Sequence, residues 1–305
     1  MISVKDALNL IRSNQPVLGT EQIAVADALG RTLSEDIKST MNLPPFSAAN
    51  MDGFAISSSE FQDQLQLIGE SSAGHPFEGE INAGEAVRIS TGARLPKGAD
   101  RILIQENANF TKDLVTVKKA PNEDTHIRPL GSDYKVGDVL LKAGQTLSAP
   151  QLMLCLAAGL ETLKVSKKPK LALLSTGDEL SPPGTELEDG KIYASNALGL
   201  KALLDSWKID VTIFDGIRDN QDDITNTISK LSEFDLIVPI GGASIGPHDL
   251  MRPSFNAAGF EIIFDRLAMR PGKPCWMGRR DKQICLLYTS PSPRDQRGSR
   301  MPSSA

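Results

Sequence analysis

The stretch that decides the fold runs from residue 237 to residue 249 and reads IVPIGGASIGPHD. Its first four residues are mostly apolar and predict a buried strand. Two glycines, a serine, a third glycine and an acid follow, and glycine lets the backbone turn sharply and approach a ligand closely. Backbone N–H groups in such a loop can hold an anion, and Asp249 could hold a cation beside it. The stretch predicts either a phosphate-binding loop at the end of a strand or a tight turn without a ligand.

A second strand leads into a polar turn at residues 173–180, which read LLSTGDEL. Ser175 and Thr176 could bond phosphate oxygens, and a carboxylate of the turn could bind Mg²⁺, which takes one or two carboxylates plus substrate phosphates and waters. The alternative is that Thr176 and Asp178 close a turn or cap a helix. Both glycine-bearing loops follow the carboxyl end of a strand, which favours a ligand site.

Strand and helix patterns alternate from residue 169 onward. This alternation predicts a doubly wound, mostly parallel sheet with helices on both faces. The predicted strands are 170–175, 211–214, 236–240 and 260–264, a further one starts at 284, and the predicted helices are 196–207, 222–231 and 250–258.

The preceding half of the chain has a different character. Residues 46–138 contain short β-prone runs broken by Gly, Pro, Asn and Asp, which predict a small β-rich domain. The four runs are 65–69, 86–90, 101–105 and 114–117. A rigid proline link at 43–46 marks a boundary. Helices are predicted at 3–12, 27–33 and 149–158, with a strand at 22–25.

These patterns predict four parts in a multidomain α/β protein. Residues 1–45 and 139–168 would form an N-terminal helical and linker domain, 46–138 the β-rich domain, and 169–287 an α/β domain. Residues 288–305 read YTSPSPRDQRGSRMPSSA and lack an apolar period, so we expect a disordered tail that does not continue the fold.

Composition limits the classes of function. The chain has 305 residues, 40% of them apolar and 23% charged, and a net charge of −5, which argues against a general nucleic-acid surface. Three cysteines and three histidines are dispersed, so neither a disulfide framework nor a zinc site is expected. No secretion signal is recognisable, and the apolar stretch 152–160 is too short to cross a bilayer. We expect a cytoplasmic protein without a membrane partner.

Four further segments carry groups that could bind a charged ligand. Residues 50–55 contain an Asp-Gly pair, and residues 89–100 combine hydroxyls with two bases. Residues 128–133 end in an acid, and Arg218-Asp219 follows a strand. Each has a plainer explanation, as a hairpin turn, a solvated turn or a helix start.

Residues 270–274 read RPGKP and offer two cations on a stiff frame. Such a frame suits a tetrahedral oxyanion, although rigid turns with exposed bases are common.

Five of these motifs occur in the order found in the molybdopterin molybdenumtransferases, which are related to the E domain of gephyrin. They are MDGFA at 51–55, STGARLP at 90–96, STGDEL at 175–180, GGASIG at 241–246 with Asp249, and PGKP at 271–274. The resemblance covers roughly residues 1–287. It implies an elongated homodimer with a β-rich second domain and a third domain similar to the adenylyltransferase of the same pathway.

The resemblance also implies a reaction. The family takes adenylylated molybdopterin and molybdate, releases AMP and places molybdenum on the dithiolene, with Mg²⁺ as cofactor. The catalytic candidates carried over are Asp52, Thr91, Asp133, Glu179, Asp219 and Asp249, of which Glu179, Asp219 and Asp249 would hold the metal. The substrate-binding candidates are Ser175, Thr176, Gly177, Ser195, Asn196, Gly241, Gly242, Ser244, Gly246, Arg270 and Lys273.

Some positions depart from the family pattern. Arg270 stands where a lysine is common, so a planar guanidinium replaces an ammonium. After residue 287 the family continues into a Pro-Gly-Asn-Pro loop and a fourth β-rich domain, and the sequence 288–305 resembles neither. Two other functions fit the same third domain: an adenylyltransferase acting on molybdopterin, and a non-enzymatic scaffold like part of gephyrin. An adenylyltransferase of the same pathway is also an expected partner.

Overall fold

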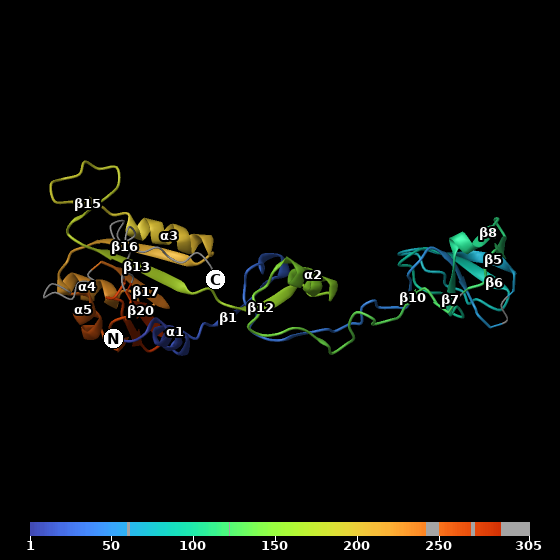
Figure 1. The fold of residues 1–305 in the computed structure, drawn as a ribbon, viewed down its shortest axis with the longest axis horizontal. Coiled ribbons are helices and arrows are strands. Elements are labelled where there is room, and N and C mark those ends of the chain that lie inside the picture. Colours follow the sequence, from blue (N-terminus) through green and yellow to red (C-terminus); the bar gives the residue numbers. More distant parts are fainter. Residues whose placement is uncertain (60–61, 122, 242–249, 270–271, 288–305) are drawn as a thin grey trace. The chain divides into compact units, whose positions relative to one another are not determined.

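A computed structural model describes residues 1–59, 62–121, 123–241, 250–269 and 272–287 (Figure 1). The chain divides into two compact units. The α/β unit comprises Met1–Thr20 and Ser166–Ala305, and the β-rich unit comprises Glu21–Val165. None of the helices formed by the described residues is long and apolar enough to cross a bilayer.

The α/β unit is built on a six-stranded sheet in the order β16-β13-β17-β20-β19-β18. The strands are β13 (Lys170–Thr176), β16 (Asp210–Ile217), β17 (Leu236–Ile240), β18 (Glu261–Phe264), β19 (Met277–Arg280) and β20 (Gln283–Leu286). The first four strands in this order are parallel, which confirms the predicted mostly parallel sheet. The other two form an antiparallel edge.

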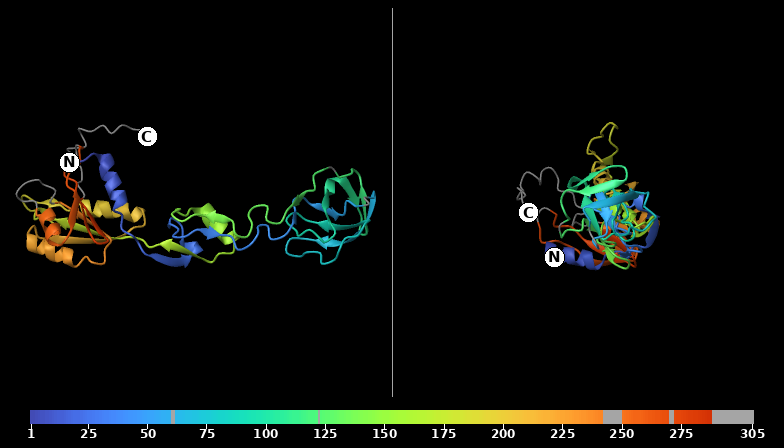
Figure 2. Two further views of the ribbon diagram at one scale, coloured as in Figure 1. Left: turned by 90° about the horizontal axis from the view of Figure 1, so that it is seen from below. Right: turned by 90° about the vertical axis from the view of Figure 1, so that its right-hand side faces the viewer.

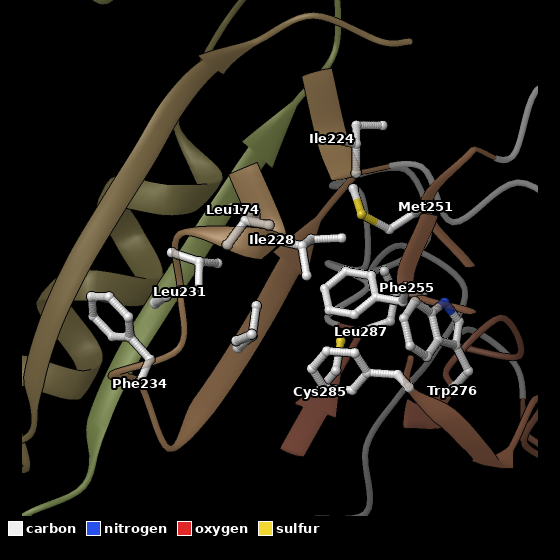
Figure 3. Close-up of a cluster of buried hydrophobic side chains, with 13 residues drawn as sticks. Leu174, Ile224, Ile228, Leu231, Phe234, Met251, Phe255, Trp276, Cys285 and Leu287 are labelled. Carbon is white, nitrogen blue, oxygen red and sulfur yellow. The ribbon is translucent and has the colours of Figure 1, made fainter. Parts of the chain in front are cut away.

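Helices cover both faces of this sheet, and successive side chains of β13 point to opposite faces and contact different helices. Leu171 and Leu173 of β13 pack with α3 (Asn196–Ser206). Ala172 and Leu174 pack with α4 (Gln221–Ser229) and α5 (Met251–Ala257). Figure 3 shows the second of these clusters, in which Phe255 lies edge-on to Trp276 with ring centroids 5.4 Å apart. Each fully buried side chain of this size contributes about 1.5–3 kcal/mol.

The first helix, α1 (Val4–Ser13), belongs to the α/β unit (Figure 1). The sequence had placed residues 1–45 together with 139–168, and the structure divides the chain after residue 20 instead. The physical reason is that the apolar face of α1, with Ala7 buried, packs on Met277 and Ile284 of the sheet's antiparallel end. The Ile2 N–H also donates to the Arg266 carbonyl at 3.0 Å.

The β-rich unit contains a second six-stranded sheet in the order β7-β4-β6-β5-β9-β8, which curls on itself (Figure 2). Its strands are β4 (Gly53–Ile56), β5 (Gln64–Ser71), β6 (Glu85–Ile89), β7 (Arg101–Ile104), β8 (Ala108–Phe110) and β9 (Leu114–Val117). Both faces are buried, since Ala55 and Phe54 lie in different apolar clusters. Gly53 therefore opens a central strand rather than a hairpin turn, and a side chain there would meet the Leu103 carbonyl.

A third apolar cluster of this unit includes Leu33, Cys155 and Leu163. Around it lie α2 (Ala149–Ala157) and two strand pairs, β1 (Thr20–Ala24) with β12 (Thr162–Ser166) and β2 (Ile37–Lys38) with β11 (Val139–Leu141). A further pair, β3 (Ala48–Ala49) with β10 (Ile127–Arg128), packs instead on the cluster that contains Ala55. The helix predicted at 27–33 is absent from this described segment. A single 3-10 turn, Val25–Asp27, stands near it, and Gly30 has a φ of 77°, which takes the backbone out of a helix.

Candidate functional site

The strand order of the α/β unit reverses at β13. The chain passes from β13 through α3 to β16 on one side, and then through α4 to β17 on the other side. In open α/β sheets, ligands bind outside the carboxyl ends of the strands at such a reversal. Ser175 and Thr176 stand at this end of β13 and are 5% and 3% exposed.

Two cavities open at this edge of the sheet. The first cavity, of about 440 Å³, lies against the ends of β13 and β16, where Asp178, Asp215 and Arg218 line it. The second cavity, of about 300 Å³, lies against the ends of β13 and β17 and the start of α3. Volumes of this order hold small-molecule ligands.

A segment that we call the arm, residues 180–194, contributes to both cavities. It begins with β14 (Leu180–Ser181) and returns through β15 (Ile192–Tyr193), and these two short strands pair with each other. Leu180 and Ala194 of the arm line both cavities, as does Ser175. The arm therefore forms a wall that the two cavities share.

The second cavity brings together six of the substrate-binding and catalytic candidates. They are Ser175, Thr176, Glu179, Ser195, Asn196 and Gly241. These residues lie at or just after the carboxyl ends of β13 and β17 and at the start of α3. All of them therefore lie at the same edge of the sheet. Gly241 is required by the close approach of the strands: its φ is 97°, and a Cβ there would lie 2.7 Å from the Thr176 carbonyl oxygen.

The turn after β13, which we call the acidic turn, comprises Gly177, Asp178 and Glu179. The Glu179 carboxylate folds over Gly177, where a Cβ would lie 2.6 Å from the nearer oxygen. Asp178 faces the first cavity and Glu179 the second. Asp219 adjoins this turn, because its N–H lies 3.5 Å from an Asp178 carboxylate oxygen. Asp219 lines neither cavity and immediately precedes Asn220, the N-cap of α4.

The acidic turn fits Mg²⁺ in one respect. Glu179 and Asp178 are exposed and provide hard oxygen ligands, and Mg²⁺ usually combines one or two carboxylates with substrate phosphates and waters. Within the described ranges, no three side chains of His, Cys, Asp or Glu cluster closely enough to enclose an ion. The described residues therefore suit a cation that substrate oxygens help to hold, and not a preformed cage.

Several predicted site residues lie outside the described ranges. They are Gly242, Ser244, Gly246, Asp249 and Arg270. Lys273 is described and exposed, and its carbonyl accepts a hydrogen bond from the Leu267 N–H at 3.0 Å. It lines neither of the two cavities.

The β-rich unit holds the other three catalytic candidates. The Thr91 N–H and hydroxyl donate to one Asp52 carboxylate oxygen at 2.6 and 2.8 Å. The Thr91 N–H first, and then its hydroxyl, hold the pKa of the Asp52 carboxyl below its ordinary value of 3.8, with a smaller contribution in the same direction from Arg88. Asp133 accepts two contacts from the Arg128 guanidinium, at 2.6 and 2.5 Å. The hydroxyl-rich turn at 90–94 thus binds a carboxylate of the protein itself.

The structure adds residues that were absent from the candidates. Asp215 and Pro182 line the first cavity, and Lys191 contacts the acidic turn from the arm. A local signal existed for Asp215, because Asp215-Gly216 directly follows the predicted strand 211–214, as the glycine-bearing turns follow the other two predicted strands. Nothing in the sequence near Lys191 indicates its contact, because the partner lies 13 residues away in the chain.

Comparisons with known proteins agree with this architecture. A family described as the MoeA N-terminal region, domains I and II, matches residues 2–159, and one described as a probable molybdopterin binding domain matches residues 172–294. The chain is similar to a Haemophilus influenzae protein named molybdopterin molybdenumtransferase, with 35% identity over 89% of this chain and 68% of that protein. A Staphylococcus aureus protein of the same name is 32% identical over 95% and 72% of the two chains.

A solved structure extends the similarity to three dimensions. The molybdopterin biosynthesis MoeA protein of Pyrococcus horikosii superposes with a TM-score of 0.80 at 30% identity, covering 94% of this chain and 74% of that one.

Proposed function

Because this chain belongs to the molybdopterin molybdenumtransferase family, we propose that it inserts molybdenum into molybdopterin and that its substrate is the adenylylated form, with release of AMP. The observation that carries this proposal is the second cavity. Six candidate residues from β13, β17, the acidic turn and the start of α3 meet there, at the strand ends where α/β sheets bind nucleotides.

The chemical difficulty is that both reactants are anions. Adenylylated molybdopterin carries phosphates, and molybdate carries two negative charges, so the site must offset their repulsion. The hydroxyls of Ser175 and Thr176 are buried at the cavity wall and can donate hydrogen bonds to phosphate oxygens. The first N–H groups of α3, at Ser195 and Asn196, add the favourable field of a helix N-terminus.

Carboxylates at the cavity serve a different purpose. Glu179, with Asp219 beside the acidic turn and Asp249 from the glycine loop, would hold Mg²⁺ in this proposal. When bound, the cation would neutralise negative charge on the phosphate groups and polarise the pyrophosphate link. Lys273, together with Arg270, would attract molybdate, since ammonium and guanidinium groups suit oxyanions. Positioning of the reactants and neutralisation of charge provide most of the rate enhancement in such reactions.

The β-rich unit supplies a second set of polar groups. Thr91 holds the pKa of the Asp52 carboxyl below its ordinary value of 3.8, so at neutral pH this carboxylate is a hydrogen-bond acceptor. In this proposal the enzyme is a homodimer, and Asp52, Thr91 and Asp133 complete the site of the partner subunit. The family resemblance supports this arrangement.

Release of AMP tests the proposed function. The purified chain is incubated with adenylylated molybdopterin, Mg²⁺ and molybdate, and AMP is measured against reactions lacking molybdate or containing EDTA. We expect AMP only in the complete reaction. Consumption of ATP with free molybdopterin, without molybdate-dependent AMP release, would instead identify an adenylyltransferase.

A further inference from the structure

We propose that Lys191 is a positioning residue, which ties the arm to the acidic turn and thereby keeps Asp178 and Glu179 directed to different cavities. This inference rests on the proposed function of the two cavities. Lys191 is outside the substrate-binding candidates, and its side chain acts through the backbone of the turn.

The contact is direct. The Lys191 Nζ donates to the Asp178 carbonyl oxygen at 2.6 Å. The next residue of the arm, Ile192, donates its N–H to the Glu179 carbonyl oxygen at 2.8 Å. Two consecutive residues of the arm therefore hold the two consecutive carbonyls of the acidic turn. The bond from the Lys191 ammonium should be the stronger of the two, because hydrogen bonds from a charged donor are stronger than those from a neutral N–H.

This attachment matters because the turn carries its two carboxylates in opposite directions. Asp178 lines the first cavity and Glu179 lines the second. The arm that lies between the cavities is fixed to the turn at its start, where Leu180 pairs with Ile192. A rotation of the turn would move one carboxylate out of its cavity and the other toward the shared wall.

Lys191 also weakens a competing ligand. Backbone carbonyl oxygens bind hard cations, as carboxylates do. The Lys191 ammonium uses one lone pair of the Asp178 carbonyl oxygen, which makes this oxygen a poorer ligand for a cation than the carboxylates.

Two substitutions at Lys191 and one control distinguish a specific loss of carboxylate positioning from a general loss of structural stability. Lys191→Met removes the donor and keeps an unbranched apolar stem, and Lys191→Arg keeps the charge and a donor. Lys201→Met is the matched control, because Lys201 pairs with Asp205 at 2.7 Å on α3 and lines neither cavity. The three variants and the unaltered chain are compared by amide hydrogen exchange without substrate and by AMP release.

For Lys191→Met we expect roughly tenfold faster exchange of the Leu180, Ile192 and Ala194 amides, which bond across the turn and the arm. We also expect kcat to fall about tenfold with KM within about twofold, since the substrate-binding hydroxyls are untouched. The Mg²⁺ concentration for half-maximal activity should rise. Lys191→Arg should restore most of each change, and Lys201→Met should alter none.

Two results would overturn the proposal. Unchanged amide exchange in Lys191→Met would show that the contact does not hold the arm. Faster exchange with kcat and Mg²⁺ dependence both unchanged would show that the arm does not position the carboxylates. Absence of AMP release by the unaltered chain would refute the proposed function instead, and the exchange measurement on substrate-free protein would still test the attachment.

Discussion

Gly241→Ala should destabilise the α/β unit, whereas the same substitution at Gly199, 42 residues earlier in the chain, should stabilise it. Gly241 has a φ of 97°, and a Cβ there would lie 2.7 Å from the backbone oxygen of Thr176. A residue held in such a conformation costs about 1–3 kcal/mol, and the contact is with backbone that cannot move aside cheaply. Gly241→Ala should therefore destabilise the α/β unit by at least that amount.

Gly199 provides the matched control. It lies within α3, and a Cβ built on it would have no neighbouring atom within 4 Å. Glycine inside a helix costs about 0.5–1 kcal/mol relative to alanine, so Gly199→Ala should stabilise the unit by about that amount. The chemical change is the same at both positions, and only the local backbone and its neighbours differ.

Tryptophan fluorescence during urea unfolding measures both changes. The chain has two tryptophans, Trp207 and Trp276, and both lie in the α/β unit, so the signal reports this unit and not the β-rich one. Trp276 is 3% exposed and should give most of the change on unfolding. Each kcal/mol should move the urea midpoint by about 0.3–1 M. A neutral or stabilising Gly241→Ala, or equal shifts in the two variants, would refute the geometry assigned to this strand end.

Two further predictions concern the β-rich unit. Thr91→Val removes the hydroxyl donor and keeps the backbone donor, so the pKa of Asp52 should rise part of the way toward 3.8. Ionised Asp52 contributes to the free energy of unfolding, and this contribution is lost as pH falls through the pKa of Asp52 in the folded protein. In Thr91→Val it should therefore be lost at a higher pH. Carbon-13 NMR titration measures this pKa, and an unchanged or lower value would contradict the assigned cause. Asp52→Asn and Glu179→Gln should each retain little activity alone, and mixing the refolded variants should restore full activity at about a quarter of the sites if the groups come from two subunits of a symmetric dimer. No recovery on mixing would place both groups in one chain.

The sequence predicts local features of this fold well. The run 236–240 coincides with β17, and 114–117 coincides with β9, because the apolar pattern and the polar residues that flank it act within a few residues. The helix at 27–33 was wrong, since Gly30 turns the chain with a positive φ. The docking of α1 and the antiparallel edge β19 were not predicted, because both depend on residues far apart in the chain.

In the candidate site, too, the sequence predicts local features but not contacts between residues far apart in the chain. Ser175, Glu179 and Gly241 could be assigned to one edge because the carboxyl ends of parallel strands lie together. The bond between Asp52 and Thr91 depends on the pairing of β4 with β6 across 39 residues, which the motifs alone do not give. The contact of Lys191 depends on how the arm folds back, and lysine is common on exposed loops.

The most direct test of the central claim is single-turnover AMP release by the unaltered chain and by Glu179→Gln, with Lys201→Met as control. If the acidic turn at the end of β13 serves the reacting phosphates, Glu179→Gln should bind the adenylylated substrate and release AMP roughly a hundredfold more slowly. Lys201→Met should release AMP at the unaltered rate. Release by Glu179→Gln as fast as by the unaltered chain would contradict the account and place the chemistry elsewhere in the protein.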